Sequence, residues 1–134
     1  MDTDTIVAAM RSPTGASAAL LRVARSGRVT LLATTPLCLE YEDVCSRPEH
    51  IETAKFSRAD LTVFLDAVID LVEPVNVWFL WRPQLRDPGD ELVLEAAVNG
   101  RADAIATFNR RDFRPADRFG IDILLPAEAI RRIS

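Results

Sequence analysis

Short apolar runs with strand character alternate with amphipathic helical segments along the whole of this 134-residue chain. Alternation of this kind favours a parallel sheet with helices on both faces. The sequence therefore predicts an α/β fold: one domain over residues 1–134, with a mainly parallel β-sheet flanked by α-helices. The predicted strands are residues 28–33, 75–81, 103–108 and 121–125. The predicted helices are residues 16–25, 35–47, 57–72 and 87–100, with a short one from residue 126.

Local signals mark where several of these helices begin and end. Thr35 precedes a proline and is the expected N-cap of its helix. Ser57 and Asp60 form a capping-box pattern with Asp in place of Glu, and Asp87 is an expected N-cap. Gly27 is placed to end the helix before it. Residues 6–10 are apolar and fit either the end of a strand or the start of a helix.

Composition excludes several classes of protein. With 49% apolar and 27% charged residues, the chain is an ordinary globular protein rather than a disordered or fibrous one. The net charge of −4 argues against a general electrostatic grip on nucleic acid. No apolar run is long enough to span a bilayer and no signal peptide is evident, so we expect a cytoplasmic protein without a membrane partner.

Cysteine and histidine are too few to build a structural site. Cys38 and Cys45 lie seven residues apart in a predicted helix, which places them on one face as buried small side chains. Two cysteines do not make a disulfide framework. The lone His50, in a polar connection, is not expected to bind zinc.

Acidic and amide residues lie in the connections between predicted strands and the helices that follow them, and one further acid lies inside a helix. Functional groups collect at the carboxyl ends of parallel strands, so residues remote in sequence can meet in one crevice. Carboxylates gathered at short range repel one another and need a cation, and hard divalent cations such as Mg²⁺ prefer oxygen ligands. The pattern predicts a metal-dependent hydrolase acting on a phosphate ester. The residues are Asp2, Asp4, Glu40, Asp87, Asp90, Asn109 and Asp112.

Each acid also has a purely structural explanation. Asp87 suits helix capping, and Asp90 stands in the capping-box position near the positive end of the helix dipole. Asp2, taken alone, is a terminal polar residue. Glu40 is different, because it sits mid-helix among apolar neighbours, and a carboxylate in such a place is rarely buried without a partner.

Four segments taken together resemble the PIN domain, in particular the branch of VapC-like ribonuclease toxins of toxin–antitoxin pairs. They are DTDTIVAA at residues 2–9, LEYEDV at 39–44, RDPGDE at 86–91 and ADAIATFNRRDF at 102–113. The resemblance covers essentially the whole chain. It implies a parallel sheet flanked by helices, acids holding Mg²⁺ or Mn²⁺, cleavage of RNA phosphodiester bonds, and an antitoxin as partner.

The same resemblance implies roles for particular residues. Asp2, Glu40 and Asp90 fall on the first three acid positions and would be catalytic metal ligands. The fourth acid position falls on Asn109, a departure that some relatives follow with an Asp at the place of Asp112. A neutral amide binds a divalent cation less strongly than a carboxylate, so a second metal ion is left open.

The start of the chain is a second departure. A parallel core needs a central first strand, yet Asp2 has only Met1 before it. Either that strand is very short, or the true start lies upstream of the one given.

Two alternatives come from the same residues. Asp2-Thr3-Asp4 looks like the opening of haloacid-dehalogenase-type phosphatases, but Ile6 departs from their pattern and the single lysine, Lys55, is badly placed. The other alternative is an interaction domain with a PIN-like fold that has lost its metal, which Asn109 keeps open.

Two further groups bear on partners. Arg110, Arg111 and Arg114 are either solvated loop charges or a backbone grip on RNA. Trp78 and Trp81 are hard to bury together, so one is expected to face a second subunit of a homodimer or an antitoxin.

Overall fold

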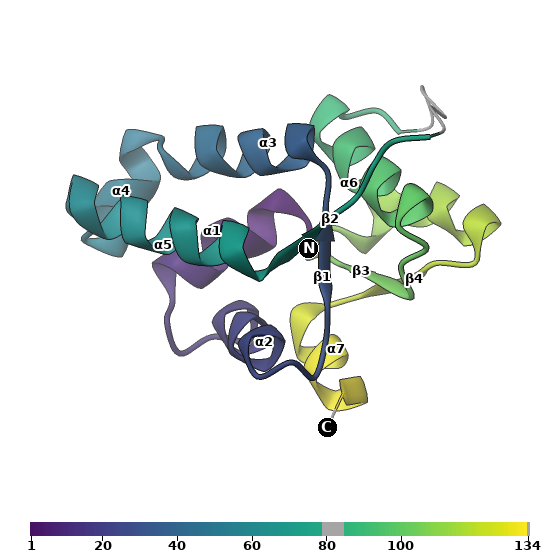
Figure 1. The fold of residues 1–134 in the computed structure, drawn as a ribbon, viewed down its shortest axis with the longest axis horizontal. Helices are drawn as coiled ribbons and strands as arrows, with labels where there is room; N and C mark the ends of the chain where they lie inside the picture. The colour runs from purple at the N-terminus through teal and green to yellow at the C-terminus, as the bar shows by residue number, and fades with distance from the viewer. Residues whose placement is uncertain (79–84, 134) are drawn as a thin grey trace.

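The computed structural model describes residues 1–78 and 85–133. Its helices are α1 (Thr3–Arg11), α2 (Ala16–Arg25), α3 (Thr35–Cys45), α4 (Pro48–Ala54), α5 (Arg58–Leu71), α6 (Pro88–Asn99) and α7 (Pro126–Ile133), with one 3-10 helix, η1 (Arg110–Phe119). Its strands are β1 (Leu31–Ala33), β2 (Val72–Pro74), β3 (Ala104–Ala106) and β4 (Asp122–Leu124). In Figure 1, α1, α3, α4 and α5 lie on one side of β1 and β2, and α6, β3 and β4 lie on the other.

The strands form two parallel pairs. β1 pairs with β2, with Leu31 opposite Val72, and β3 pairs with β4, with Ile105 opposite Ile123. This confirms the predicted α/β class and the parallel direction. The single sheet implied by the sequence is not formed, because within the described residues no ladder joins β1 to β3. The amino terminus lies beside β3, where the N–H of Asp2 donates to the carbonyl of Ala106.

All four strands are shorter than predicted, and the prediction differs most in the first two segments. The strand expected at residues 28–33 is reduced to its last three residues, because β2 offers only three partners. The strand expected at residues 75–81 is wrong: β2 precedes it, and pairing ends where the N–H of Val75 donates to the carbonyl of Ala33 at 2.9 Å. Residues 79–81 of that predicted strand lie outside the described residues.

Helix starts follow the local signals closely. Ser57 Oγ accepts a hydrogen bond from the N–H of Asp60 at 3.0 Å. In turn, the Asp60 carboxylate accepts one from the N–H of Ser57 at 2.8 Å, as the capping box predicts. Asp87 is the N-cap of α6, as predicted. The N-cap of α3 is Thr34 rather than Thr35, because Thr34 Oγ1 is the acceptor for the N–H three residues on.

Two α-helices and the 3-10 helix η1 were not predicted in full. Residues 6–10 belong to α1, which resolves that ambiguity in favour of a helix. The polar connection expected around His50 is α4, which begins at Pro48, a residue preorganised for the first helical turn. Gly27 has φ +84° just beyond α2, where a residue without a side chain ends a helix at little cost.

One apolar core holds the elements together. Its fully buried large side chains include Ile6 and Met10 of α1, Leu37 of α3, Leu94 of α6 and Phe113 of η1. The core therefore draws on segments from both sides of the two strand pairs. No helix of the described residues is long and apolar enough to cross a membrane.

The predicted burial of the cysteines is confirmed for Cys45 and only in part for Cys38. Both lie in α3 as free thiols, Cys45 fully buried and Cys38 partly buried. Burial raises the pKa of the Cys45 thiol to about 11, so it stays protonated at neutral pH. Tyr41, also buried in α3, donates its hydroxyl proton to the carbonyl of Met1 and ties this helix to the start of the chain.

Candidate active site

Asp2 is held at the carboxyl end of β3. Its backbone N–H donates to the carbonyl of Ala106 at 2.9 Å, and its carboxylate accepts the hydroxyl proton of Thr107 at 2.7 Å. Although it is the N-cap residue of α1, its side chain makes no capping bond. It is only 3% exposed, and burial raises its pKa, with the Thr107 bond opposing the shift. Asp2 is therefore a buried carboxylate with a fixed orientation.

Thr107 and Asn109 extend this network to Asp4. The hydroxyl of Thr107 accepts the N–H of Asn109 at 3.0 Å. The side-chain amide of Asn109 donates to a carboxylate oxygen of Asp4 at 3.2 Å. The first turn of α1 and the loop after β3 are thus joined side chain to side chain, across 105 positions of sequence.

Asp90 lies in the first turn of α6, partly buried, and its electrostatics are unusual. Burial raises its pKa to about 7, with further contributions, in decreasing order, from Asp2, Asp87, Asp112 and Asp4. Four other carboxylates therefore act on Asp90 through space. Its ionised form is therefore less stable than that of a free aspartate, as expected for acids crowded together without a cation.

Glu40 of α3 reaches the same helix start. A methyl group added at Gly89 would lie 3.1 Å from Glu40 Oε1 and 3.0 Å from Asp87 Oδ1. The missing side chain at Gly89 thus leaves the space into which the Glu40 carboxylate projects. This packing accounts for an acid in mid-helix, because its charge points toward the positive end of the α6 dipole.

Five carboxylates thus converge from four segments, and we call them the acidic site: Asp2, Asp4, Glu40, Asp90 and Asp112. Asp87 borders the site, but its carboxylate is engaged in capping, accepting the N–H groups of Gly89 at 2.7 Å and Asp90 at 3.2 Å. No lysine, arginine or histidine in the described part of the chain forms an ion pair with the acidic site.

A hard divalent cation fits this set of donors. Asp90 is destabilised by its acidic neighbours, and Gly89 leaves open the space that Glu40 enters, so added positive charge here would relieve repulsion. The carboxylates do not form a closed cage: among residues 1–78 and 85–133, no three acidic, histidine or cysteine side chains stand together as a ready-made metal-binding group.

The arginines predicted to grip RNA lie on η1. Arg110 pairs with Glu128 of α7 at 3.1 Å. Arg111 and Arg114 are exposed, and no ion pair within the described residues joins either of them to Asp112. Asp112 is thus not engaged by either arginine, and its carboxylate contributes to the raised pKa of Asp90.

Sequence reasoning gave no role to several residues that the structure brings forward. Thr107 links Asp2 to Asn109, and its place at the end of a strand in the Thr107-Phe108-Asn109 segment was the available signal. Glu91 and Glu95, one turn apart in α6, are buried at 5% and 3% exposure. Both are acids among apolar helical neighbours, which is the signal that singled out Glu40.

Comparison with known protein families identifies one family to which the chain is similar. A family model described as the PIN domain matches residues 1–111 of the chain. No curated protein and no solved structure matches it. Since the family match spans most of the chain and includes Asp2, Glu40, Asp90 and Asn109, the chain belongs to the PIN domain family, whose members are generally nucleases that use divalent metals.

Proposed function

We propose that this protein is an endoribonuclease that needs Mg²⁺ or Mn²⁺ and hydrolyses phosphodiester bonds of RNA. The observation that carries the proposal is Asp90, which burial and four neighbouring carboxylates hold at a pKa of about 7. A cluster of this kind in a PIN domain suits a cation, because like charges converge there without a pairing side chain in the described residues.

Asp2, Glu40 and Asp90 would hold the metal, with Asn109 and Asp112 at the edge of the site. When bound, a divalent cation supplies an activated water and neutralises the charge that builds on the phosphate oxygens. Hydrolysis then adds one water across one P–O bond, and no side-chain nucleophile is required.

The other residues position this set. The hydroxyl of Thr107 holds one oxygen of Asp2, which leaves the second oxygen to face a ligand. Asp87 satisfies two N–H groups at the start of α6, so Asp90 is not drawn into capping. Gly89 keeps the approach of Glu40 open.

RNA would approach over η1 and the loop before it. Arg111 and Arg114 are exposed there, and arginine suits contacts with phosphate. Phe108, 48% exposed next to Asn109, offers a face on which a base can stack. These local contacts would supply the affinity for RNA that a net charge of −4 does not favour.

We also propose that the protein acts as the toxin of a type II toxin–antitoxin pair in the cytoplasm. The support is the motif resemblance together with exposed apolar side chains suited to a partner, Trp78 at 76% and Val63 at 70% exposure. Induced expression should arrest growth, and co-expression of an adjacent small gene should relieve the arrest. Unimpaired growth on induction would argue for a different cellular role.

One observation favours a second candidate, a PIN-fold interaction domain with little or no catalysis. Asn109 stands at the fourth acid position, and its side-chain amide donates a hydrogen bond to Asp4. Such a protein would bind RNA or a protein partner without cutting it. The phosphatase alternative is set aside, because the chain belongs to the PIN family.

The decisive test incubates the purified protein with labelled RNA in Mn²⁺, in Mg²⁺ and in excess EDTA. Cleavage with either metal, loss in EDTA and recovery on adding metal back would support the nuclease. Binding without cleavage at any metal concentration would favour the interaction domain.

A further inference from the structure

One stretch of this acidic chain is positively charged. Between Asp4 and Glu40 the sequence contains no acidic residue. The charged residues of that stretch are all arginine: Arg11, Arg22, Arg25 and Arg28. All of them are exposed. Since the net charge of the whole chain is −4, its charges are divided unevenly along the sequence.

The turn after α2 keeps Arg28 beside the end of the helix. The N–H of Gly27 donates to the carbonyl of Ala24 at 3.0 Å. The N–H of Arg28 donates to the carbonyl of Val23 at 3.3 Å. This pair of bonds is the Schellman motif, which folds the chain back over the last helical turn. Arg28 is therefore held close to Arg25, the last residue of α2.

Arg22 adds a guanidinium whose position is fixed. It lies three residues before Arg25, so the two side chains share one side of α2. Its Nη1 donates to the carbonyl of Pro13 at 2.9 Å, which holds the guanidinium over the loop between α1 and α2. A guanidinium has five N–H donors, so most of those of Arg22 remain for a ligand.

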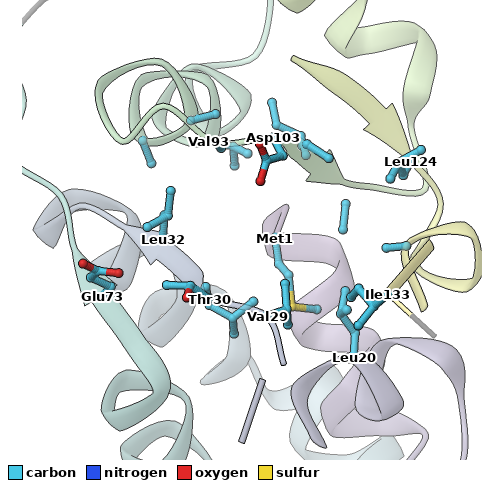
Figure 2. A pocket seen from close by; sticks show the side chains of 18 of the residues that line it. Met1, Leu20, Val29, Thr30, Leu32, Glu73, Val93, Asp103, Leu124 and Ile133 are labelled. Atoms are coloured by element: carbon cyan, nitrogen blue, oxygen red, sulfur yellow. The ribbon is translucent and has the colours of Figure 1, made fainter. Parts of the chain in front are cut away.

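Helix α7 brings more arginine to the same end of the molecule. α2 and α7 pack together and lie side by side in Figure 1. Figure 2 shows Leu20 of α2 next to Ile133 of α7 in the wall of a cavity of about 490 Å³. Arg28 and Arg132 line the same cavity. The last turn of α7 carries Arg132 and its neighbour Arg131, both exposed.

We call the following residues the arginine patch: Arg22, Arg25, Arg28 and Arg131. Within residues 1–78 and 85–133, none of them forms an ion pair, whereas Arg132 pairs with Asp122 at 2.7 Å. The helix dipole favours a cation in the last turn of a helix, which accounts for Arg25 and Arg131 taken singly. It does not account for Arg28, which lies beyond the helix, or for the lack of acids around it.

The surroundings of the patch favour a polyanion over a protein as its ligand. On the described part of the chain, the exposed large apolar side chains lie on other segments: Leu39, Val63, Val77, Trp78 and Phe108. Protein interfaces are built around apolar and aromatic anchors, whereas interfaces with nucleic acid are polar and strongly positive. Clustered arginines with unused N–H donors suit phosphate oxygens. The patch therefore fits a phosphate backbone.

We propose that the arginine patch is a second RNA-binding site, separate from the acidic site. The proposal rests on the proposed function in taking RNA as the ligand. In Figure 1, α2 and α7 lie at the lower end of the molecule, and α3, which carries Glu40, lies at the upper end. The patch would hold the part of a long RNA that extends beyond the acidic site, where carboxylates repel phosphates.

The test measures binding of a labelled RNA of about 20 nucleotides by fluorescence anisotropy in EDTA. Arg25→Gln/Arg28→Gln should weaken binding about 10-fold. It should also flatten the slope of log K against log salt by about 1.4, because each phosphate contact to a single strand contributes about 0.7. Arg25→Lys/Arg28→Lys, which keeps both charges, should retain the slope. Circular dichroism checks the fold of each variant.

The matched control removes the same charge elsewhere. Lys55→Gln/Arg58→Gln changes two exposed cations around the start of α5 and should alter neither affinity nor slope. RNA length gives a second measurement. Lengthening the RNA from about 5 to about 20 nucleotides should strengthen binding to the unmodified protein about 10-fold. In Arg25→Gln/Arg28→Gln this gain should be lost.

Two results would overturn the proposal. Unchanged affinity and salt slope in Arg25→Gln/Arg28→Gln would show that RNA binds elsewhere on the protein. Failure of the unmodified protein to bind RNA would do the same, and patch-dependent binding of polyglutamate would then assign the patch to an acidic segment of a protein partner. Patch-dependent RNA binding without cleavage in Mn²⁺ or Mg²⁺ would support this site and contradict the proposed nuclease, so the two proposals fail separately.

Discussion

The starts of α5 and α6 carry nearly the same local pattern and differ in what they do. Each has a capping residue followed three positions later by an aspartate, Ser57 with Asp60 and Asp87 with Asp90. Asp60 accepts the N–H of Ser57 at 2.8 Å, and this bond lowers its pKa. Asp90 is turned toward other acids, and its pKa rises to about 7.

The difference comes from the capping residue and from packing. Asp87 accepts two N–H bonds by itself, so α6 needs nothing from Asp90. The start of α5 faces solvent, whereas the start of α6 faces Glu40 and Asp2. The same spacing thus places an aspartate inside the cap of one helix and leaves the Asp90 carboxylate outside the cap of the other.

The sharpest test of this contrast is a matched pair of substitutions. Asp90→Asn should lower RNA cleavage by roughly 100-fold or more, because it removes a ligand charge where catalysis needs it. Asp60→Asn should leave cleavage unchanged. Initial rates on one labelled RNA, with circular dichroism to check the fold, decide the matter. Full activity in the Asp90→Asn variant would show that Asp90 has a structural role only.

The edge of the acidic site should respond more weakly. Asp112→Ala should raise the Mn²⁺ concentration for half-maximal cleavage by about 10-fold, and Asn109→Asp should lower it, because charge count tunes oxygen-ligand sites. Asp117→Ala, an exposed change on the same η1 helix, is the control. Identical metal titrations for all three variants would place the fourth position outside the metal site.

The two helix starts also predict opposite dependence of stability on pH. The folded pKa of Asp90 lies above its ordinary value of 3.8, so without metal its contribution falls as pH rises from about 4 to about 7. The folded pKa of Asp60 is lowered, so its contribution is lost as pH falls below about 4.

Urea unfolding in EDTA across this pH range measures both effects. Asp90→Asn should remove the loss of stability between pH 4 and 7, and Mn²⁺ supplied in place of EDTA should counter that loss in the unmodified protein. An unaltered pH profile for Asp90→Asn would contradict the raised pKa.

The smallest effect is expected at the α5 cap. Ser57→Ala should lower the free energy of unfolding by about 1 kcal/mol, as loss of an N-cap hydroxyl usually does, without changing cleavage. Thermal unfolding and the same RNA assay provide the measurement. A drop in activity here would mean that α5 communicates with the acidic site and that the two helix starts are not independent.

Local features of the fold were readable in advance. The α2 span, the capping box at Ser57, the cap at Asp87 and the turn at Gly27 each depend on bonds between residues at most five apart. Strand lengths and the position of β2 could not be predicted from the sequence, because a strand ends where its partner ends. α4 was missed because the segment around His50 was interpreted as a polar connection, although Pro48 suits the first turn of a helix.

By itself, the sequence determined most helix boundaries, the parallel α/β class and the residue types suited to a divalent cation. Only the tertiary structure decided that Thr107 would hold Asp2 across 105 positions, that Glu40 would reach the space at Gly89, and that Asp90 would lose its preference for ionisation. The physical reason is range. Capping depends on neighbours within one turn, whereas burial and the field of other carboxylates arise only when distant segments pack together.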